Sequence, residues 1–154
     1  MLHKEILMKK ERSGDIFRKH EVILAYLFGS QKEAGISFLE GVATRIDDEV
    51  DLDIGVVFKT FPEDTFEAYG ELYANLSLFF EPFTVDLVFL QETDALFQYE
   101  AITGELVFSD DELYLEEYEE QVMKRASDLS FKKNEFEKDF LEAVKDGYFE
   151  ITHR

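Results

Sequence analysis

Three short apolar runs constrain the fold of this chain more than any other feature. They lie at residues 22–28, 51–58 and 83–90 and are rich in β-branched and aromatic side chains. Each run is shorter than most helices, so each is predicted to form a buried strand. An aspartate pair opens the second run, and a single aspartate lies in the middle of the third.

The segments between these runs carry apolar residues at three- and four-residue spacing, which is typical of amphipathic helices. The predicted helices lie at residues 4–20, 63–80 and 110–145, with shorter ones after residues 31 and 94 and a fourth strand at 106–108. Residues 130–131 are predicted to kink or divide the last helix. Strands that alternate with helices in so short a chain predict a compact α/β (α+β) unit.

Length and charge narrow the class of protein. A chain of 154 residues fits one domain, predicted at residues 1–154 with a helical extension at 110–148. Its formal charge of −19 repels phosphate backbones, so no direct nucleic-acid binding is expected.

The lack of Cys excludes thiolate metal sites and a cysteine nucleophile. No apolar run resembles a membrane span or signal peptide, so a cytoplasmic protein without membrane contact is expected, and a homo-oligomer is left open.

Three aspartates and one Gly-Ser pair occupy positions suited to phosphate chemistry. Side chains alternate along a strand, so Asp51 and Asp53 are expected on one face of the second strand. Asp86 lies within the third strand, where a carboxylate without a partner or metal would be costly. Gly29 and Ser30 follow the first strand, and a glycine there allows the backbone to approach a phosphate closely.

These residue types fit a metal-dependent nucleotidyl-transfer site. In such reactions paired divalent ions about 4 Å apart neutralise the attacking and leaving oxygens, and Mg²⁺ prefers oxygen ligands. Asp51 and Asp53 would bridge two Mg²⁺ ions, and Asp86 would complete the site or act as a general base. Without metal, close carboxylates repel one another, so at least one pKa is predicted to be raised. Each motif is weak alone, and their combination carries the hypothesis.

The order of these motifs resembles that of the DNA polymerase β-type nucleotidyltransferase superfamily. The resemblance rests on Gly29-Ser30, Asp51-Leu52-Asp53-Ile54 and Val85-Asp86-Leu87-Val88. More narrowly, with the segment 99–108, the chain resembles minimal nucleotidyltransferase (MNT) antitoxins, which pair with HEPN ribonuclease toxins. Members of the MntA type transfer AMP from ATP to a tyrosine of the HEPN partner.

That resemblance implies a small mixed sheet flanked by helices and a C-terminal helical segment. It also implies ATP as a substrate, a HEPN-type protein as partner and magnesium as cofactor. Gly29 and Ser30 would bind the triphosphate, and Asp51, Asp53 and Asp86 would bind the metal.

Two departures from the family pattern keep alternatives open. The spacer at residues 31–50 is longer than in minimal members. The basic residue that commonly follows the Gly-Ser turn, just ahead of a glycine, has no match in residues 31–35, where Lys32, or Arg45 further along, is the candidate substitute. The leading hypothesis is an adenylyltransferase that acts on a protein hydroxyl. The alternatives are a non-catalytic antitoxin that neutralises a HEPN-type partner by contact, and a nucleotidyltransferase that modifies a small molecule of the antibiotic type.

Overall fold

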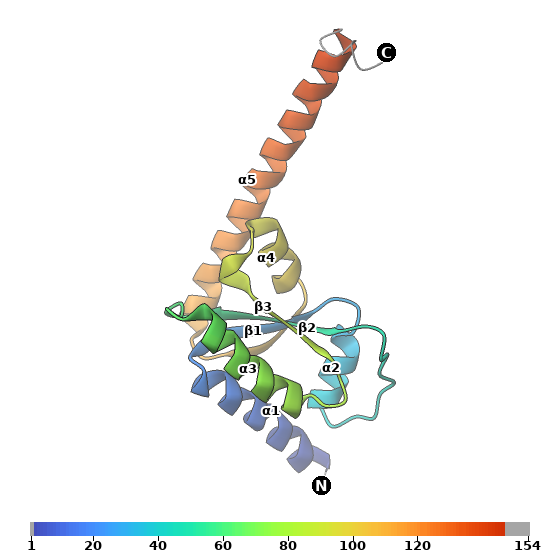
Figure 1. Ribbon diagram of the computed structural model, residues 1–154, viewed down its shortest axis with the longest axis vertical. Coiled ribbons are helices and arrows are strands. Elements are labelled where there is room, and N and C mark those ends of the chain that lie inside the picture. The colour runs from blue at the N-terminus through green and yellow to red at the C-terminus, as the bar shows by residue number, and fades with distance from the viewer. Residues whose placement is uncertain (1, 147–154) are drawn as a thin grey trace.

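The centre of the molecule is a four-stranded mixed sheet in the order β3-β2-β1-β4 (Figure 1). The computed structural model describes residues 2–146, with side chains from residue 8 onward. The strands are β1 (Val22–Phe28), β2 (Leu52–Phe58), β3 (Val85–Phe89) and β4 (Glu105–Ser109). Strand β1 pairs antiparallel with β2 and β4, whereas β2 and β3 run parallel.

Helices cover both faces of this sheet (Figure 1). They are α1 (Leu2–Lys19), α2 (Lys32–Leu39), α3 (Thr65–Phe79), α4 (Ala95–Ile102) and α5 (Glu112–Lys145), with a 3-10 helix, η1 (Leu90–Glu92), after β3. Helices α1, α2 and α3 share a core with one face, which includes Phe17 and Leu72. Helix α4 and the first turns of α5 cover the other face, over Tyr26 and Val57.

The α/β fold class expected from the sequence is confirmed, with small differences at the strand ends. Strand β2 begins at Leu52, whose backbone N–H donates to the Thr84 carbonyl (2.8 Å). The third apolar run forms a shorter strand than predicted, because Leu90 leaves the ladder to begin η1 and packs over Gly55. The fourth strand was predicted at 106–108 and extends one residue further at each end.

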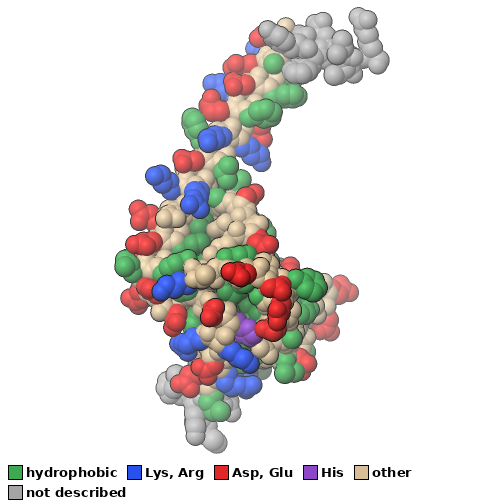
Figure 2. Space-filling view, turned by 60° about the vertical axis from the view of Figure 1, so that its left-hand side comes forward, with side chains coloured by type: hydrophobic (Ala, Val, Ile, Leu, Met, Phe, Trp, Pro, Cys, Tyr) green, Lys and Arg blue, Asp and Glu red, His purple; other side chains and the backbone are tan. Residues whose placement is uncertain are grey.

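Helix α5 is unbroken, so the predicted kink at residues 130–131 is wrong. Leu129 before this pair and Lys132 and Lys133 after it are good helix formers, whereas serine and phenylalanine weaken a helix only slightly. Val122 and Ala126 are buried in α5, whereas Phe131 and Phe136 further along are 66% and 70% exposed. Figure 2 shows apolar, basic and acidic side chains mixed along this outer half. Residues 147–148 of the predicted extension lie outside the described residues.

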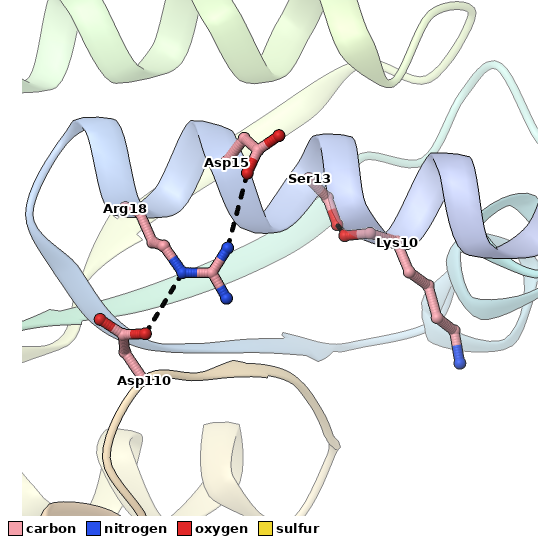
Figure 3. Close-up of polar contacts among 5 residues, drawn as sticks. All are labelled: Lys10, Ser13, Asp15, Arg18 and Asp110. Carbon is pink, nitrogen blue, oxygen red and sulfur yellow. Dashed lines mark hydrogen bonds and ion pairs between the residues drawn. The ribbon is translucent and has the colours of Figure 1, made fainter.

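An ion pair joins α1 to Asp110, the residue after β4 (Figure 3). The guanidinium Nε of Arg18 donates to the Asp110 carboxylate (3.2 Å), and its Nη1 lies 3.5 Å from the Asp15 carboxylate. All three side chains are exposed, so these ion pairs contribute little to stability by themselves.

Among residues 2–146, no helix combines the length and the apolar character needed to cross a membrane.

Candidate functional site

Asp53 and Asp86 are direct neighbours in the sheet. They are partners in the parallel register of β2 and β3, so their side chains leave the same face side by side. Leu52 and Ile54, on either side of Asp53, enter the core beneath α1 and α3. Alternation along the strand therefore directs Asp53 toward the face that α4 and α5 cover. The sequence-predicted convergence of these two acids is observed.

The turn after β1 lies against the same carboxylate. Phe28 is paired with Asp53 across β1 and β2, and Gly29 follows with φ +78°, a left-handed conformation that favours glycine. A Cβ atom at Gly29 would collide with Oδ2 of Asp53. Position 29 therefore requires glycine for two reasons: its backbone conformation, and the lack of a side chain where the Asp53 carboxylate lies.

The pKa of Asp53 is raised from its ordinary value of 3.8 to about 6. Partial burial is the main cause, followed by a hydrogen bond with the Asp86 carboxyl group and by the negative charge of that residue. The charges of Asp51 and Glu100 raise it further. Carboxylates this close cannot all be ionised cheaply, because each disfavours the charge of the next. Asp53 therefore holds a proton more readily than an isolated aspartate, and a bound cation would relieve the repulsion.

Asp51 and Ser30 lie at the edge of this cluster. Asp51 immediately precedes β2 and is exposed, and its negative charge is close enough to raise the pKa of Asp53. Ser30 is exposed in the turn directly after Gly29. The structure thus brings Gly29, Asp53 and Asp86 together with Asp51 nearby, whereas the roles of all these residues stay predictions.

The chemistry of the donor set fits a hard divalent cation. Within residues 2–146 no group of three or more His, Cys, Asp or Glu side chains is already arranged to hold a metal. Mg²⁺ rarely needs such a group, because one or two carboxylates plus substrate phosphates and waters usually bind it. The Asp53 and Asp86 pair, with Asp86 exposed at the sheet edge, supplies carboxylate oxygens of that kind.

Two residues of the site were not found by sequence reasoning. Glu100 lies in α4, and its charge reaches Asp53 only because α4 folds back over the sheet. Gln31 follows the Gly-Ser turn, is 5% exposed and forms hydrogen bonds with the loop before Asp51. No signal in the sequence singled out Gln31, because its burial depends on the loop that packs against it.

In the part of the chain that the structure describes, neither candidate cation forms an ion pair with Asp51, Asp53 or Asp86. The Lys32 ammonium lies 4.0 Å from the Glu33 carboxylate, its neighbour in α2. Arg45 is exposed and lines a surface cavity together with Ile46, Asp47, Asp48 and Glu49. Neither side chain is therefore assigned to the site.

The fold and the paired acids define a nucleotidyltransferase-type domain, and comparison with known families agrees. Residues 11–113 match the family model described as polymerase beta, nucleotidyltransferase. Because this match spans more than half of the chain, the chain belongs to the polymerase beta nucleotidyltransferase family. No curated protein sequence matches the chain significantly.

Several solved structures share this fold. A toxin-antitoxin complex with a double Asp-to-Glu mutation is similar with a TM-score of 0.63 and 17% identity, over 86% of this chain and 98% of that one. A toxin-antitoxin complex with AMP-PNP gives 0.62 and 19%, over 86% and 98%. A tri-AMPylated HEPN toxin of Shewanella oneidensis in complex with its MNT antitoxin gives 0.57 and 16%, over 88% and 98%. At these identities the similarity shows a common fold.

Proposed function

We propose that this protein is a Mg²⁺-dependent nucleotidyltransferase that transfers AMP from ATP to a hydroxyl group of a HEPN-type protein partner. The observation that carries the proposal is the pairing of Asp53 with Asp86 directly beside the Gly29 turn. Two carboxylates and a close backbone turn are what a metal-bound triphosphate requires.

The structural relatives support the nucleotide and the partner. One was solved with AMP-PNP, an ATP analogue, and another contains a HEPN toxin that carries AMP groups. A third carries Asp-to-Glu changes at two positions that are separated by one residue, the spacing of Asp51 and Asp53 here. A chain that shares their fold and this acid pattern is therefore expected to share the reaction.

The residues divide into two roles in this proposal. Gly29 and Ser30 would hold the triphosphate, because the bare glycine backbone permits close approach and the serine hydroxyl can donate to a phosphate oxygen. Asp51, Asp53 and Asp86 would bind two Mg²⁺ ions, which neutralise charge on the attacking and leaving oxygens when bound. The charges of the three aspartates then balance those of the cations rather than repel one another.

The transfer itself is a displacement at the α-phosphorus of ATP. The acceptor hydroxyl oxygen forms a bond to this phosphorus, the bond from phosphorus to the pyrophosphate oxygen breaks, and the hydroxyl proton is lost to a base. Asp86 is the candidate base, because it is exposed at the sheet edge where an acceptor could approach.

A labelling experiment tests this proposal. The protein is incubated with Mg²⁺, the product of the adjacent gene and ATP labelled at its α-phosphate. Label is expected to appear on the partner with the wild type and to be lost with Asp51→Ala and with Asp53→Ala. Glu63→Gln removes one negative charge from an exposed residue beyond the other end of β2 and should leave transfer unchanged. No transfer by the wild type to any partner hydroxyl would contradict the proposal.

One observation favours a second candidate, an antitoxin that acts by contact alone. Lys32, the first cation after the Gly-Ser turn, lies beside Glu33 rather than free for a phosphate. In that case the catalytically silent variants Asp51→Ala and Asp53→Ala would still neutralise the partner in cells. Loss of neutralisation together with loss of label transfer would instead favour the enzyme.

A further inference from the structure

Gln31 connects the Gly29-Ser30 turn to the loop that precedes Asp51. Its backbone directly follows Gly29 and Ser30, and its side chain turns away to a loop that contains no helix or strand, residues 42–51. Gln31 is 5% exposed, although glutamine is mostly found on protein surfaces. A buried amide is costly unless its polar atoms are bonded, so the contacts of Gln31 carry the argument.

All parts of the Gln31 amide are used. Nε2 donates to the carbonyl oxygens of Asp47 (3.0 Å) and Val50 (2.5 Å). Oε1 accepts from the backbone N–H of Asp47 (3.1 Å). Gln31 is also the N-cap residue of α2, but its side chain does not cap that helix. The amide is therefore committed to the loop and not to its own helix.

The contact with Val50 is adjacent to the acids. Val50 is followed by Asp51, and Leu52 then enters β2 beside Asp53. Because Gln31 holds the Val50 carbonyl, it restricts where the next residue, Asp51, can lie relative to Asp53 and Asp86. A single side chain thus joins the phosphate turn on one side to the first aspartate on the other.

We propose that Gln31 is a positioning residue that fixes Asp51 beside the Asp53 and Asp86 pair and so raises the affinity of the site for divalent cations. This inference rests on the proposed function and adds a residue to it. Replacing a group that hydrogen-bonds to a metal-ligating side chain commonly lowers the metal affinity by about 10- to 100-fold. Gln31 holds the backbone next to Asp51 rather than the Asp51 carboxylate, so an effect at the lower end of this range is expected.

The chain offers a matched control at the other end of β2. Gln91 forms the same kind of bonds with a backbone, because its Oε1 accepts from the Phe58 N–H (2.8 Å) and its Nε2 donates to the Phe58 carbonyl (2.8 Å). Replacing either glutamine by methionine keeps the side-chain length and removes the amide. Gln91→Met therefore reproduces the loss of a glutamine bridge at a distance from the acids.

The test measures the full-length protein in two ways. Backbone hydrogen exchange of the metal-free protein reports on residues 46–53, and Mn²⁺ binding without nucleotide is followed by electron paramagnetic resonance. Gln31→Met is expected to speed exchange at 46–53 and to weaken Mn²⁺ binding about tenfold. Gln91→Met is expected to leave both unchanged. Gln31→Asn, which keeps the amide on a shorter side chain, should give the same direction of change and replaces Gln31→Met if that variant does not fold.

Two results would overturn the inference. One is wild-type exchange at residues 46–53 in Gln31→Met, which would mean that the amide does not hold the loop. The other is wild-type Mn²⁺ affinity in a variant whose loop exchanges faster, which would separate the loop from the metal site. A wild type that binds no Mn²⁺ even when ATP is added contradicts the proposed function itself, and the exchange measurement then decides whether Gln31 holds the loop.

Discussion

Gly29 and Asp53 lie so close together that the Asp53 carboxylate fills the space that a side chain at residue 29 would need. The two residues come from neighbouring antiparallel strands, at the end where β1 finishes and β2 begins. This contact places the turn that would bind a phosphate directly beside the acid that would bind a cation.

Replacing Gly29 by alanine should therefore damage both the fold and the site. The new Cβ would meet Asp53, and alanine at φ +78° is strained, so a loss of about 1–3 kcal/mol in the free energy of unfolding is expected. Gly70→Ala is the control, since this glycine lies in α3 with nothing near its missing Cβ. That change should stabilise the protein by about 0.5–1 kcal/mol. Thermal denaturation measures both, and equal stability of Gly29→Ala and the wild type would contradict the packing described here.

The raised pKa of Asp53 should fall when its neighbour loses its charge. Asp86→Asn removes a negative charge and offers an amide donor, which favours the ionised form of Asp53. Titration of the metal-free protein by carbon NMR is expected to give a pKa for Asp53 near 6 in the wild type and a lower one in the variant. An unchanged Asp53 pKa would mean that Asp86 does not raise it.

The acid cluster should cost stability in the absence of metal. Because the folded pKa of Asp53 exceeds its ordinary 3.8, the fold favours the protonated form, and stability is lost as pH rises from 3.8 through about 6. Asp53→Asn removes this penalty. In chelator at pH 8 the variant should be more stable than the wild type by about 1 kcal/mol, and the difference should shrink toward pH 4. A variant that is less stable at pH 8 would show that Asp53 supports the fold.

Tyr26 should anchor α5 to the sheet. Its hydroxyl donates to the Glu119 carboxylate (2.9 Å) beneath the first turns of α5, and burial raises its pKa above the ordinary 10.0. Tyr26→Phe is expected to lower the free energy of unfolding by about 1 kcal/mol. The wild type should also lose stability as pH rises above 10, because the fold disfavours the ionised phenol, and Tyr26→Phe should lose less. Tyr99→Phe, at an exposed position, is the control in urea denaturation; equal effects of the two changes would contradict the anchoring role.

Much of the site could be predicted from the sequence because strand geometry is periodic. Alternation along the strands predicted that Asp86 would face the same side as the aspartate pair if its strand lay alongside, and the parallel register of β2 and β3 places it directly beside Asp53. Gly29 could be expected in the turn, since few other residues end a strand so abruptly. These are local rules, and they remained valid in the folded chain.

Other parts depend on contacts that no local rule contains. In the sequence, Gln31 cannot be told apart from other polar residues, because its role depends on hydrogen bonds with a loop more than ten residues away. Glu100 becomes a neighbour of Asp53 only through the placement of α4 over the sheet. The predicted break at residues 130–131 failed for the opposite reason, because local helix preference continued where a break was expected.

The most direct test of this account is calorimetric titration of Mg²⁺ and ATP into the wild type, Asp86→Asn and Glu63→Gln. We expect the wild type and Glu63→Gln to bind the nucleotide only when Mg²⁺ is present, and Asp86→Asn to bind much more weakly. Equal binding by Asp86→Asn and the wild type, or no binding by the wild type, would contradict the claim that Asp53, Asp86 and the Gly29 turn form one metal–nucleotide site.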